Sequence, residues 1–97
     1  MLEITRYRLR GSGNADGFVR ADSALQQDWY YAQPGCRRRA TFGNSDGWWV
    51  TLVWWDEGPA KSSTDTDQHP LVSAENPTVA FVDANTLTTE LFDELSG

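Results

Sequence analysis

The run over residues 48–55, Trp-Trp-Val-Thr-Leu-Val-Trp-Trp, is apolar on both alternating faces and constrains the fold more than any other feature. On a β-strand, one face would carry Trp48, Val50, Leu52 and Trp54, and the other Trp49, Val53 and Trp55. Such a strand has to be covered on both sides. Asn-Ser-Asp-Gly at 44–47 predicts a tight hairpin that joins this strand to a preceding one over residues 37–44.

The rest of the chain divides into five further segments. Residues 2–10 are typical of a strand that ends at Gly11. Residues 15–33 predict a helix, which ends at Pro34-Gly35 and has one apolar stripe made of Phe18, Val19, Ala21, Leu25, Trp29 and Ala32. Residues 58–76 are polar, and we expect a short exposed helix or a loose segment there, with a turn at His69-Pro70. Pro77 favours a helical turn over 78–84, and residues 86–95 alternate as a last strand.

This order, β-α-β-β-α-β, predicts one α+β domain over residues 1–97 with a four-stranded antiparallel sheet. A chain of 97 residues suffices for one hydrophobic core. Two helical segments can cover only one face of such a sheet, yet the third strand is apolar on both. The second face therefore needs a partner, and we expect a second copy related by a two-fold axis, which gives a homodimer.

Charge and cysteine content exclude several classes of function. The formal net charge is −6, which disfavours nucleic acid and anionic membrane surfaces as partners. Cys36 is the single cysteine, and no Cys and His spacing typical of zinc sites is present, so we expect no metal. No stretch approaches the roughly 18 apolar residues of a membrane span. We expect a soluble cytoplasmic protein.

Three segments, Gln33 to Arg38, Asn44 to Val50 and Val53 to Trp55, resemble the helix end, the second strand and the third strand of a known family. That family is the dimeric α+β barrel proteins related to antibiotic biosynthesis monooxygenases. The resemblance implies a ferredoxin-like subunit that pairs sheet to sheet, with a small cleft between sheet and helices in each subunit. The matching motifs position the fold, so they imply more about shape than about chemistry.

Some members of this family cleave haem with an Asn on the first strand and a Trp and a His on the second helical segment. Here residues 2–10 contain no Asn, and residues 60–75 contain His69 but no Trp. We therefore expect no haem and no other cofactor. The resemblance leaves a cofactor-independent oxygenase that acts on a small aromatic molecule, in which the protein supplies a dry cleft and a proton acceptor.

The candidate catalytic residues are His69, as a general base, and Tyr7, whose hydroxyl could bind a substrate oxygen. A surface or helix-ending role for His69 is the competing interpretation. We expect ligand contacts from Tyr30, Tyr31, Trp54, Trp55, Arg6 and Arg8, and a place in the dimer interface for Trp49. Arg37, Arg38 and Arg39 alternate in direction on their strand, so ion pairs with acids such as Glu90 or Glu94 are expected of them.

Two functions remain open on the sequence alone. One is a monooxygenase-like enzyme without a bound cofactor. The other is a non-catalytic dimer that binds a small ligand or is associated with stress, and in which the barrel is a stable scaffold.

Overall fold

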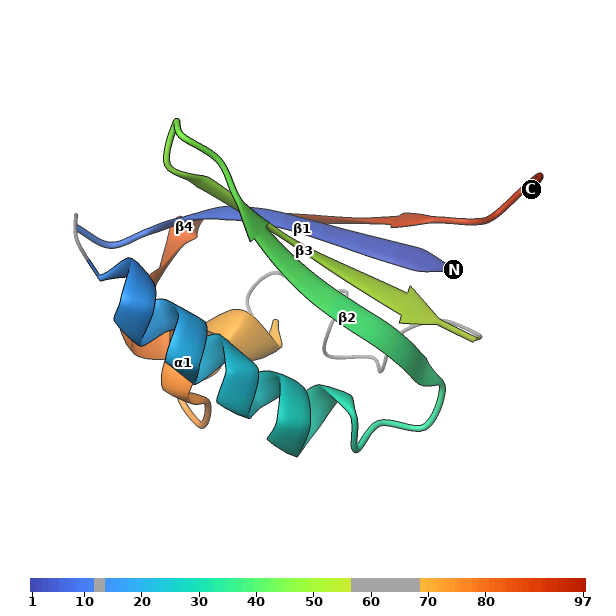
Figure 1. Cartoon of the computed structure of the whole chain (residues 1–97), viewed down its shortest axis with the longest axis horizontal. Helices are drawn as coiled ribbons and strands as arrows, with labels where there is room; N and C mark the ends of the chain where they lie inside the picture. Colours follow the sequence, from blue (N-terminus) through green and yellow to red (C-terminus); the bar gives the residue numbers. More distant parts are fainter. Residues whose placement is uncertain (12–13, 57–68) are drawn as a thin grey trace.

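The computed structural model describes residues 1–11, 14–56 and 69–97 (Figure 1). Its elements in chain order are β1 (Leu2–Leu9), α1 (Ala15–Leu25), the π-helical turn η1 (Gln26–Tyr30), β2 (Cys36–Gly43), β3 (Trp48–Trp55), the 3₁₀ turns η3 (Pro70–Val72) and η4 (Pro77–Ala80), and β4 (Val82–Phe92).

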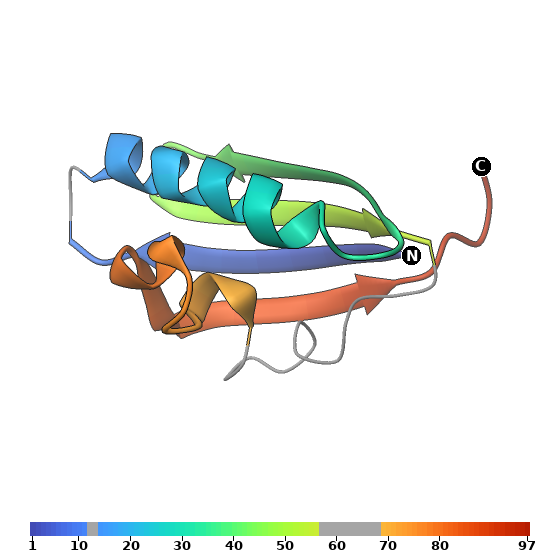
Figure 2. The same cartoon turned by 90° about the horizontal axis from the view of Figure 1, so that it is seen from below.

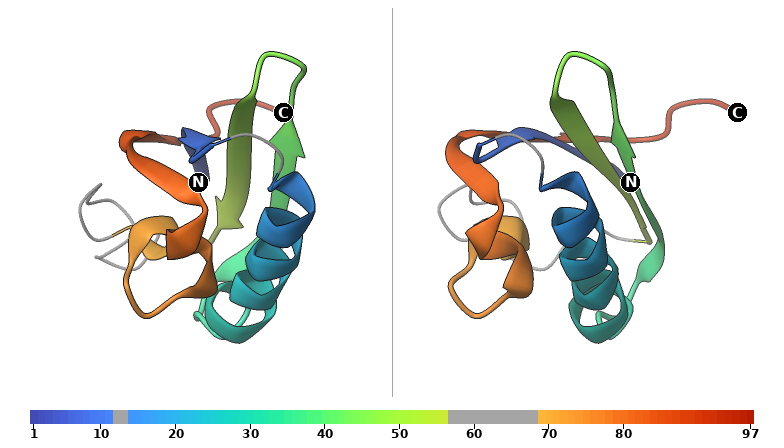
Figure 3. Two further views of the ribbon diagram at one scale, coloured as in Figure 1. Left: turned by 90° about the vertical axis from the view of Figure 1, so that its left-hand side faces the viewer. Right: turned by 60° about the vertical axis from the view of Figure 1, so that its left-hand side comes forward.

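The four strands form one antiparallel sheet in the order β2-β3-β1-β4. This is an α+β arrangement compatible with a ferredoxin-like subunit. α1, η3 and η4 all lie on one side of the sheet, as Figures 1 and 3 show. Seen from that side in Figure 2, α1 runs along β2 and β3, and the two 3₁₀ turns lie beside β4. The described residues place no helix on the other side of the sheet.

The β2–β3 hairpin forms at the predicted position. Asn44 Oδ1 accepts hydrogen bonds from the backbone N–H groups of Asp46 and Trp48, both at 3.0 Å. Gly47 has φ of +84°, a conformation that side chains with a Cβ rarely adopt. The sequence predicts positive φ angles for the Asp-Gly pair of this turn. Asp46 has a negative φ, so only Gly47 adopts the left-handed conformation.

The first helix is shorter than predicted because its end widens into a π turn. The N–H of Tyr31 donates to the carbonyl of Gln26, five residues back, at 2.9 Å. The wider turn shifts the helical register by one residue and turns Tyr30 inward, where it is fully buried. Two members of the predicted stripe, Val19 and Ala32, are exposed, against the prediction.

The second helical region consists of two short turns in the described part of the chain. Most of the polar segment predicted over residues 58–76 lies outside the described residues. Pro77 starts η4 as expected, but η4 ends at Ala80 and β4 already begins at Val82. The predicted last strand over residues 86–95 is therefore displaced towards the N-terminus, and it ends at Phe92.

The core lies between the sheet and the helical layer. Tyr7, Val53 and Trp55 enter it from the central strands, and Phe18 and Leu25 from α1. The alternation predicted for β3 is confirmed, because Thr51, Val53 and Trp55 are buried there while their neighbours are half-buried on the opposite face.

Candidate functional site

A buried polar cluster occupies the layer between the sheet and η3. The Glu3 carboxylate accepts hydrogen bonds from Trp55 Nε1 at 3.0 Å and Thr5 Oγ1 at 3.3 Å. His69 Nε2 lies 3.1 Å from Glu3 Oε2, and both residues have no exposed surface. Thr89 Oγ1 lies 3.0 Å from Thr5 Oγ1 and extends the network to β4. A buried carboxylate needs such donors, because an unpaired polar group in the interior is costly.

The backbone fixes the tautomer of His69. The N–H of Leu71 donates to His69 Nδ1 at 3.1 Å, so this nitrogen carries no proton. The proton of the neutral imidazole is therefore on Nε2, where it is donated to Glu3. The ring thus joins η3 to β1 rather than facing solvent. The surface role for His69 is wrong, because the residue is fully buried, whereas the alternative of a place at a helix end agrees with its position as the cap of η3.

A second buried polar group joins α1 to β2. Arg39 donates two hydrogen bonds to Asp22, at 3.1 and 2.6 Å, and its guanidinium lies 4.4 Å from the ring centre of Tyr30. Burial lowers the pKa of Arg39, but the hydrogen bonds and charge of Asp22 more than offset this effect and keep it raised. This forked pair fixes the helix against the sheet.

Tyr7 is bound to the sheet by its hydroxyl. Tyr7 Oη lies 2.7 Å from Thr51 Oγ1, which in turn lies 3.1 Å from Thr41 Oγ1. Burial raises the pKa of Tyr7 well above its usual value, and the Asp22 carboxylate adds to the effect. Burial likewise raises the pKa of Tyr30. Both phenols stay neutral across the physiological pH range.

The predicted catalytic residues share the interior but have no access to solvent. Tyr7, Tyr30 and His69 are each 0% exposed, and Trp55 is 2% exposed. Their side chains fill the layer in which the sequence predicts a cleft. The two pockets described below are lined by neither Tyr7 nor His69. Tyr31, in contrast, is 49% exposed at the end of the helix and contributes nothing to this layer.

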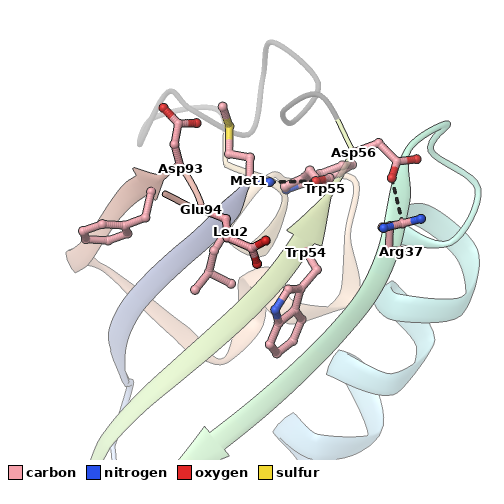
Figure 4. A pocket seen from close by; sticks show the side chains of 9 residues that line it. Met1, Leu2, Arg37, Trp54, Trp55, Asp56, Asp93 and Glu94 are labelled. Atoms are coloured by element: carbon pink, nitrogen blue, oxygen red, sulfur yellow. Dashed lines mark hydrogen bonds and ion pairs between the residues drawn. The ribbon is translucent and has the colours of Figure 1, made fainter. Parts of the chain in front are cut away.

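A pocket of about 390 Å³ lies at the end of the sheet where β1 begins and β4 ends (Figure 4). Leu2, Trp54 and Phe92 give it apolar walls, and Trp55 also lines it. Its polar rim includes Arg37 and Asp56, which form an ion pair at 2.7 Å, and Glu94. Trp54 and Trp55 of the predicted ligand contacts therefore meet at one pocket.

The uncovered side of the sheet, called the open face below, carries apolar side chains in cross-strand rows. The strand register places the side chains of this face, both apolar and polar, in rows across the sheet. The first row holds Phe92, Leu2, Trp54 and Arg38, and the second holds Glu90, Ile4, Leu52 and Ala40. The third row holds Thr88, Arg6, Val50 and Phe42, and Arg8 lies beside Trp48 in the row after it. Most of the apolar members are half-buried, and Phe42 and Phe92 are 50% and 47% exposed.

Arginines stack on the tryptophans of the open face. The guanidinium carbons of Arg6 and Arg8 lie 4.7 and 4.5 Å from the ring of Trp48, and that of Arg38 lies 4.8 Å from Trp54. Arg6 also lines a second pocket of about 250 Å³ beside Trp48. The predicted ligand contacts Arg6 and Arg8 therefore lie on the opposite face from Tyr7 and His69.

Trp49 lies on the helix-covered side. Its ring packs edge-on against Phe18, with ring centres 5.0 Å apart. Strand alternation correctly divides each tryptophan pair between the two faces, but Trp48, rather than Trp49, is the member on the open face. A partner on that face would contact Trp48 and Trp54.

The sequence did not reveal Glu3 and Asp22 as the two acids that form buried hydrogen bonds in the interior. Glu3 precedes Thr5 and Tyr7 at a spacing of two, which places all three on one face of β1. Asp22 lies one residue from the helical stripe, beside Ala21. A charged residue within an apolar register is a signal of a buried pair. Arg39 and Arg37 bind Asp22 and Asp56, so the acids suggested as their partners, Glu90 and Glu94, are wrong for both.

Residues 1–11, 14–56 and 69–97 contain no group of three or more His, Cys, Asp or Glu side chains placed to hold a metal ion. In the same ranges no helix is both long and apolar enough to cross a membrane. Burial raises the pKa of the Cys36 thiol, which makes it a poor nucleophile.

No protein-family model, curated protein or solved structure matches this chain.

Proposed function

We propose that the chain is a non-catalytic homodimeric module, in which the open faces of two copies pack together as a dimeric α+β barrel. One observation carries the proposal: no described helix covers the open face, which is apolar along the whole of β3 and at Leu2 and Ile4 of β1. Contiguous exposed apolar surface of this kind is typical of protein interfaces.

The size of the open face suits a dimer. Four strands about 4.8 Å apart and about eight residues long give a footprint of about 500 Å² per copy. Two copies would bury about 1,000 Å² in total, near the lower limit for a specific interface. The centre of the face, around Ile4, Leu52 and Val50, is aliphatic except for Arg6, which lies beside Val50, whereas Arg8 and Arg38 lie nearer the margins. An apolar centre with a polar rim is the usual anatomy of a specific interface.

The closed interior supports the non-catalytic part of the proposal. A reaction at Tyr7 and His69 would require a substrate to enter a layer in which both side chains are fully buried and hydrogen-bonded. The His69–Glu3 pair is explained by its structural role, since it joins η3 to β1.

The first experiment measures the mass of the protein in solution by light scattering and compares two matched variants. The wild type should have twice the chain mass of 10.9 kDa. Val50→Glu places a charge at the centre of the open face and should give a folded monomer. Val19→Glu makes the same change on α1, where Val19 is already 48% exposed, and should remain dimeric. Circular dichroism checks the fold of both variants.

Two results would contradict the proposal. A wild type that stays monomeric at high concentration would show that the proposed dimer does not form. A Val50→Glu variant that remains dimeric would show that the open face is not the interface. Oxygen uptake with phenolic substrates that disappears in a folded His69→Asn variant would show catalysis, and the enzyme hypothesis would then replace this one.

The pocket at the sheet end favours a second candidate function, the binding of a small aromatic molecule. Its volume of about 390 Å³ is within the range of small-molecule sites, and Trp54 offers a ring for stacking. Titration with phenol should shift the indole N–H resonance of Trp54 in an NMR spectrum. If only the resonances of residues outside the pocket move, the pocket is not a binding site.

A further inference from the structure

The second pocket, of about 250 Å³, lies on the open face beside the β2–β3 hairpin. Phe42 and Val50 line it from the third row of that face, and Trp48 lines it from the row after. Arg6 of β1 and Asn44 of the hairpin add the polar part of the lining. The pocket therefore combines aromatic rings with two polar side chains.

Both polar side chains offer donors to a ligand. The guanidinium of Arg6 has no acceptor atom. Asn44 Oδ1 already accepts two backbone hydrogen bonds, from Asp46 and Trp48, each at 3.0 Å, so the NH₂ group is the free part of this amide. No carboxylate of the described residues lines the pocket. A ligand that fits these walls has a hydrogen-bond acceptor at its polar end.

The monomer already holds Arg6 in place. Its guanidinium carbon lies 4.7 Å from the ring centre of Trp48, and Arg8 stacks on the same ring at 4.5 Å. Stacking uses the face of the guanidinium plane and leaves its in-plane N–H groups available for a carboxylate. Arg6 forms no ion pair within the described residues.

Acids also occur around this part of the sheet, but outside the pocket. Asp46 lies in the hairpin turn, and Asp83 and Glu90 lie on β4, which is separated from β3 by β1. None of the three lines the pocket or forms an ion pair with Arg6 in the described ranges. Asp83 Oδ1 accepts the backbone N–H of Asn85 at 3.1 Å. Arg6 therefore supplies the charge of the pocket lining.

We infer that this pocket binds a small aromatic carboxylate. Its ring would pack against Trp48 and Phe42, and its two oxygens would accept hydrogen bonds from Arg6 and Asn44. An ionised carboxylate is an acceptor only, and the forked donors of an arginine match its geometry. The volume of about 250 Å³ is below that of most drug-sized sites, so a single ring suits it.

This site also gives the proposed dimer a means of regulation. Arg6, Val50 and Phe42 belong to the open face, so the ligand and a second copy need the same surface. A molecule that binds only the separated copies shifts the equilibrium towards the monomer. This regulation rests on the proposed dimer, whereas the binding site does not.

Three ligands with one ring and different charges test the site. Benzoate should bind with a dissociation constant on the order of 1 mM and shift the indole N–H resonance of Trp48 and the side-chain NH₂ resonances of Asn44. Benzyl alcohol should bind about tenfold more weakly, because it lacks the charge-assisted hydrogen bonds. Benzylamine, which is a cation at neutral pH, should bind no better than benzyl alcohol.

Two substitutions separate Arg6 from the overall charge of the protein. Arg6→Gln should lower the affinity for benzoate to that for benzyl alcohol and leave the binding of benzyl alcohol unchanged. Arg20→Gln makes the same change at an exposed position of α1, on the other side of the sheet, and should bind benzoate like the wild type. Circular dichroism checks that both variants are folded.

Sedimentation velocity tests the competition with the second copy. Benzoate at about ten times its dissociation constant should raise the apparent dimer dissociation constant about a hundredfold, because each of the two released copies binds a ligand. Sodium chloride at the same ionic strength is the control for salt.

The outcomes distinguish this site from the proposed function. If benzoate binds no more tightly than benzyl alcohol, or shifts only resonances outside the pocket, the carboxylate site is wrong and the dimer stands. If benzoate binds through Arg6 but leaves the dimer dissociation constant unchanged, the competition is wrong. A monomeric wild type that binds benzoate through Arg6 would exclude the dimer and its regulation and keep the site.

Discussion

Glu3 is the acceptor on which the buried cluster depends, because three donors converge on its two oxygens. Glu3→Gln keeps the shape but replaces one oxygen with an NH₂ group. At least one of Trp55, Thr5 and His69 then faces another donor. We expect a loss of about 2–3 kcal/mol in the free energy of unfolding, measured in urea at constant protein concentration.

The matched control for Glu3→Gln is Glu94→Gln, since Glu94 is exposed. It should change the free energy of unfolding by no more than about 0.5 kcal/mol in conditions where the protein is monomeric. Equal effects of the two substitutions would mean that the cluster does not hold the fold together.

Tyr30 offers the opposite case, a buried hydroxyl whose oxygen has no hydrogen-bond partner among the described residues. Tyr30→Phe removes an unsatisfied polar group, so we expect it to raise the free energy of unfolding by up to about 1 kcal/mol at neutral pH. Tyr7→Phe removes the hydrogen bond with Thr51 and should lower the free energy of unfolding by about 1 kcal/mol. Urea unfolding of both variants checks the difference in sign, and a stabilising Tyr7→Phe would contradict it.

The same phenols predict a loss of stability in alkali. Burial raises the pKa of Tyr7 and of Tyr30 in the folded state above the value of about 10 in the unfolded chain. Their contribution is therefore fully present below about pH 10 and is lost as the pH rises above that value. The unfolding free energy of the wild type should fall more steeply above about pH 10 than that of a Tyr7→Phe, Tyr30→Phe double variant. Parallel curves would show that other groups control alkaline unfolding.

At the scale of elements, the hairpin depends on one glycine. Gly47 has φ of +84°, and a Cβ there would lie 3.2 Å from Arg8 Nη1. Gly47→Ala should lower the free energy of unfolding by about 1–2 kcal/mol, and Gly47→Asn should cost less because Asn tolerates this conformation. Thermal unfolding of the two variants measures the order. An alanine variant as stable as the wild type would mean that the hairpin relaxes to another turn.

At the scale of the whole molecule, dimerisation would couple stability to concentration. If the open faces pack together, the thermal midpoint should rise as the chain concentration is raised about a hundredfold, because association favours the folded state. Val50→Glu should abolish this dependence. A wild-type midpoint that does not move with concentration would count against the dimer.

The sequence by itself determined the elements whose signals are local. The strand β1, the β2–β3 hairpin and the alternation of β3 follow from residues adjacent in the chain, and all three are present. The start of α1 follows in the same way. The α+β order was predictable because strand and helix periodicities depend on short-range geometry.

Only the tertiary structure decided the contacts between distant residues. The π turn places Tyr30 against Arg39, which binds Asp22 between helix and strand, and no helical periodicity encodes that meeting. His69 finds Glu3 across 66 positions of sequence, so neither residue alone reveals the pair. Which tryptophan of each pair faces the helices depends on the side of the sheet that α1 covers. Strand alternation separates the residues of β3 into two faces, but only the packing of α1 shows which face is covered by helices and which is open.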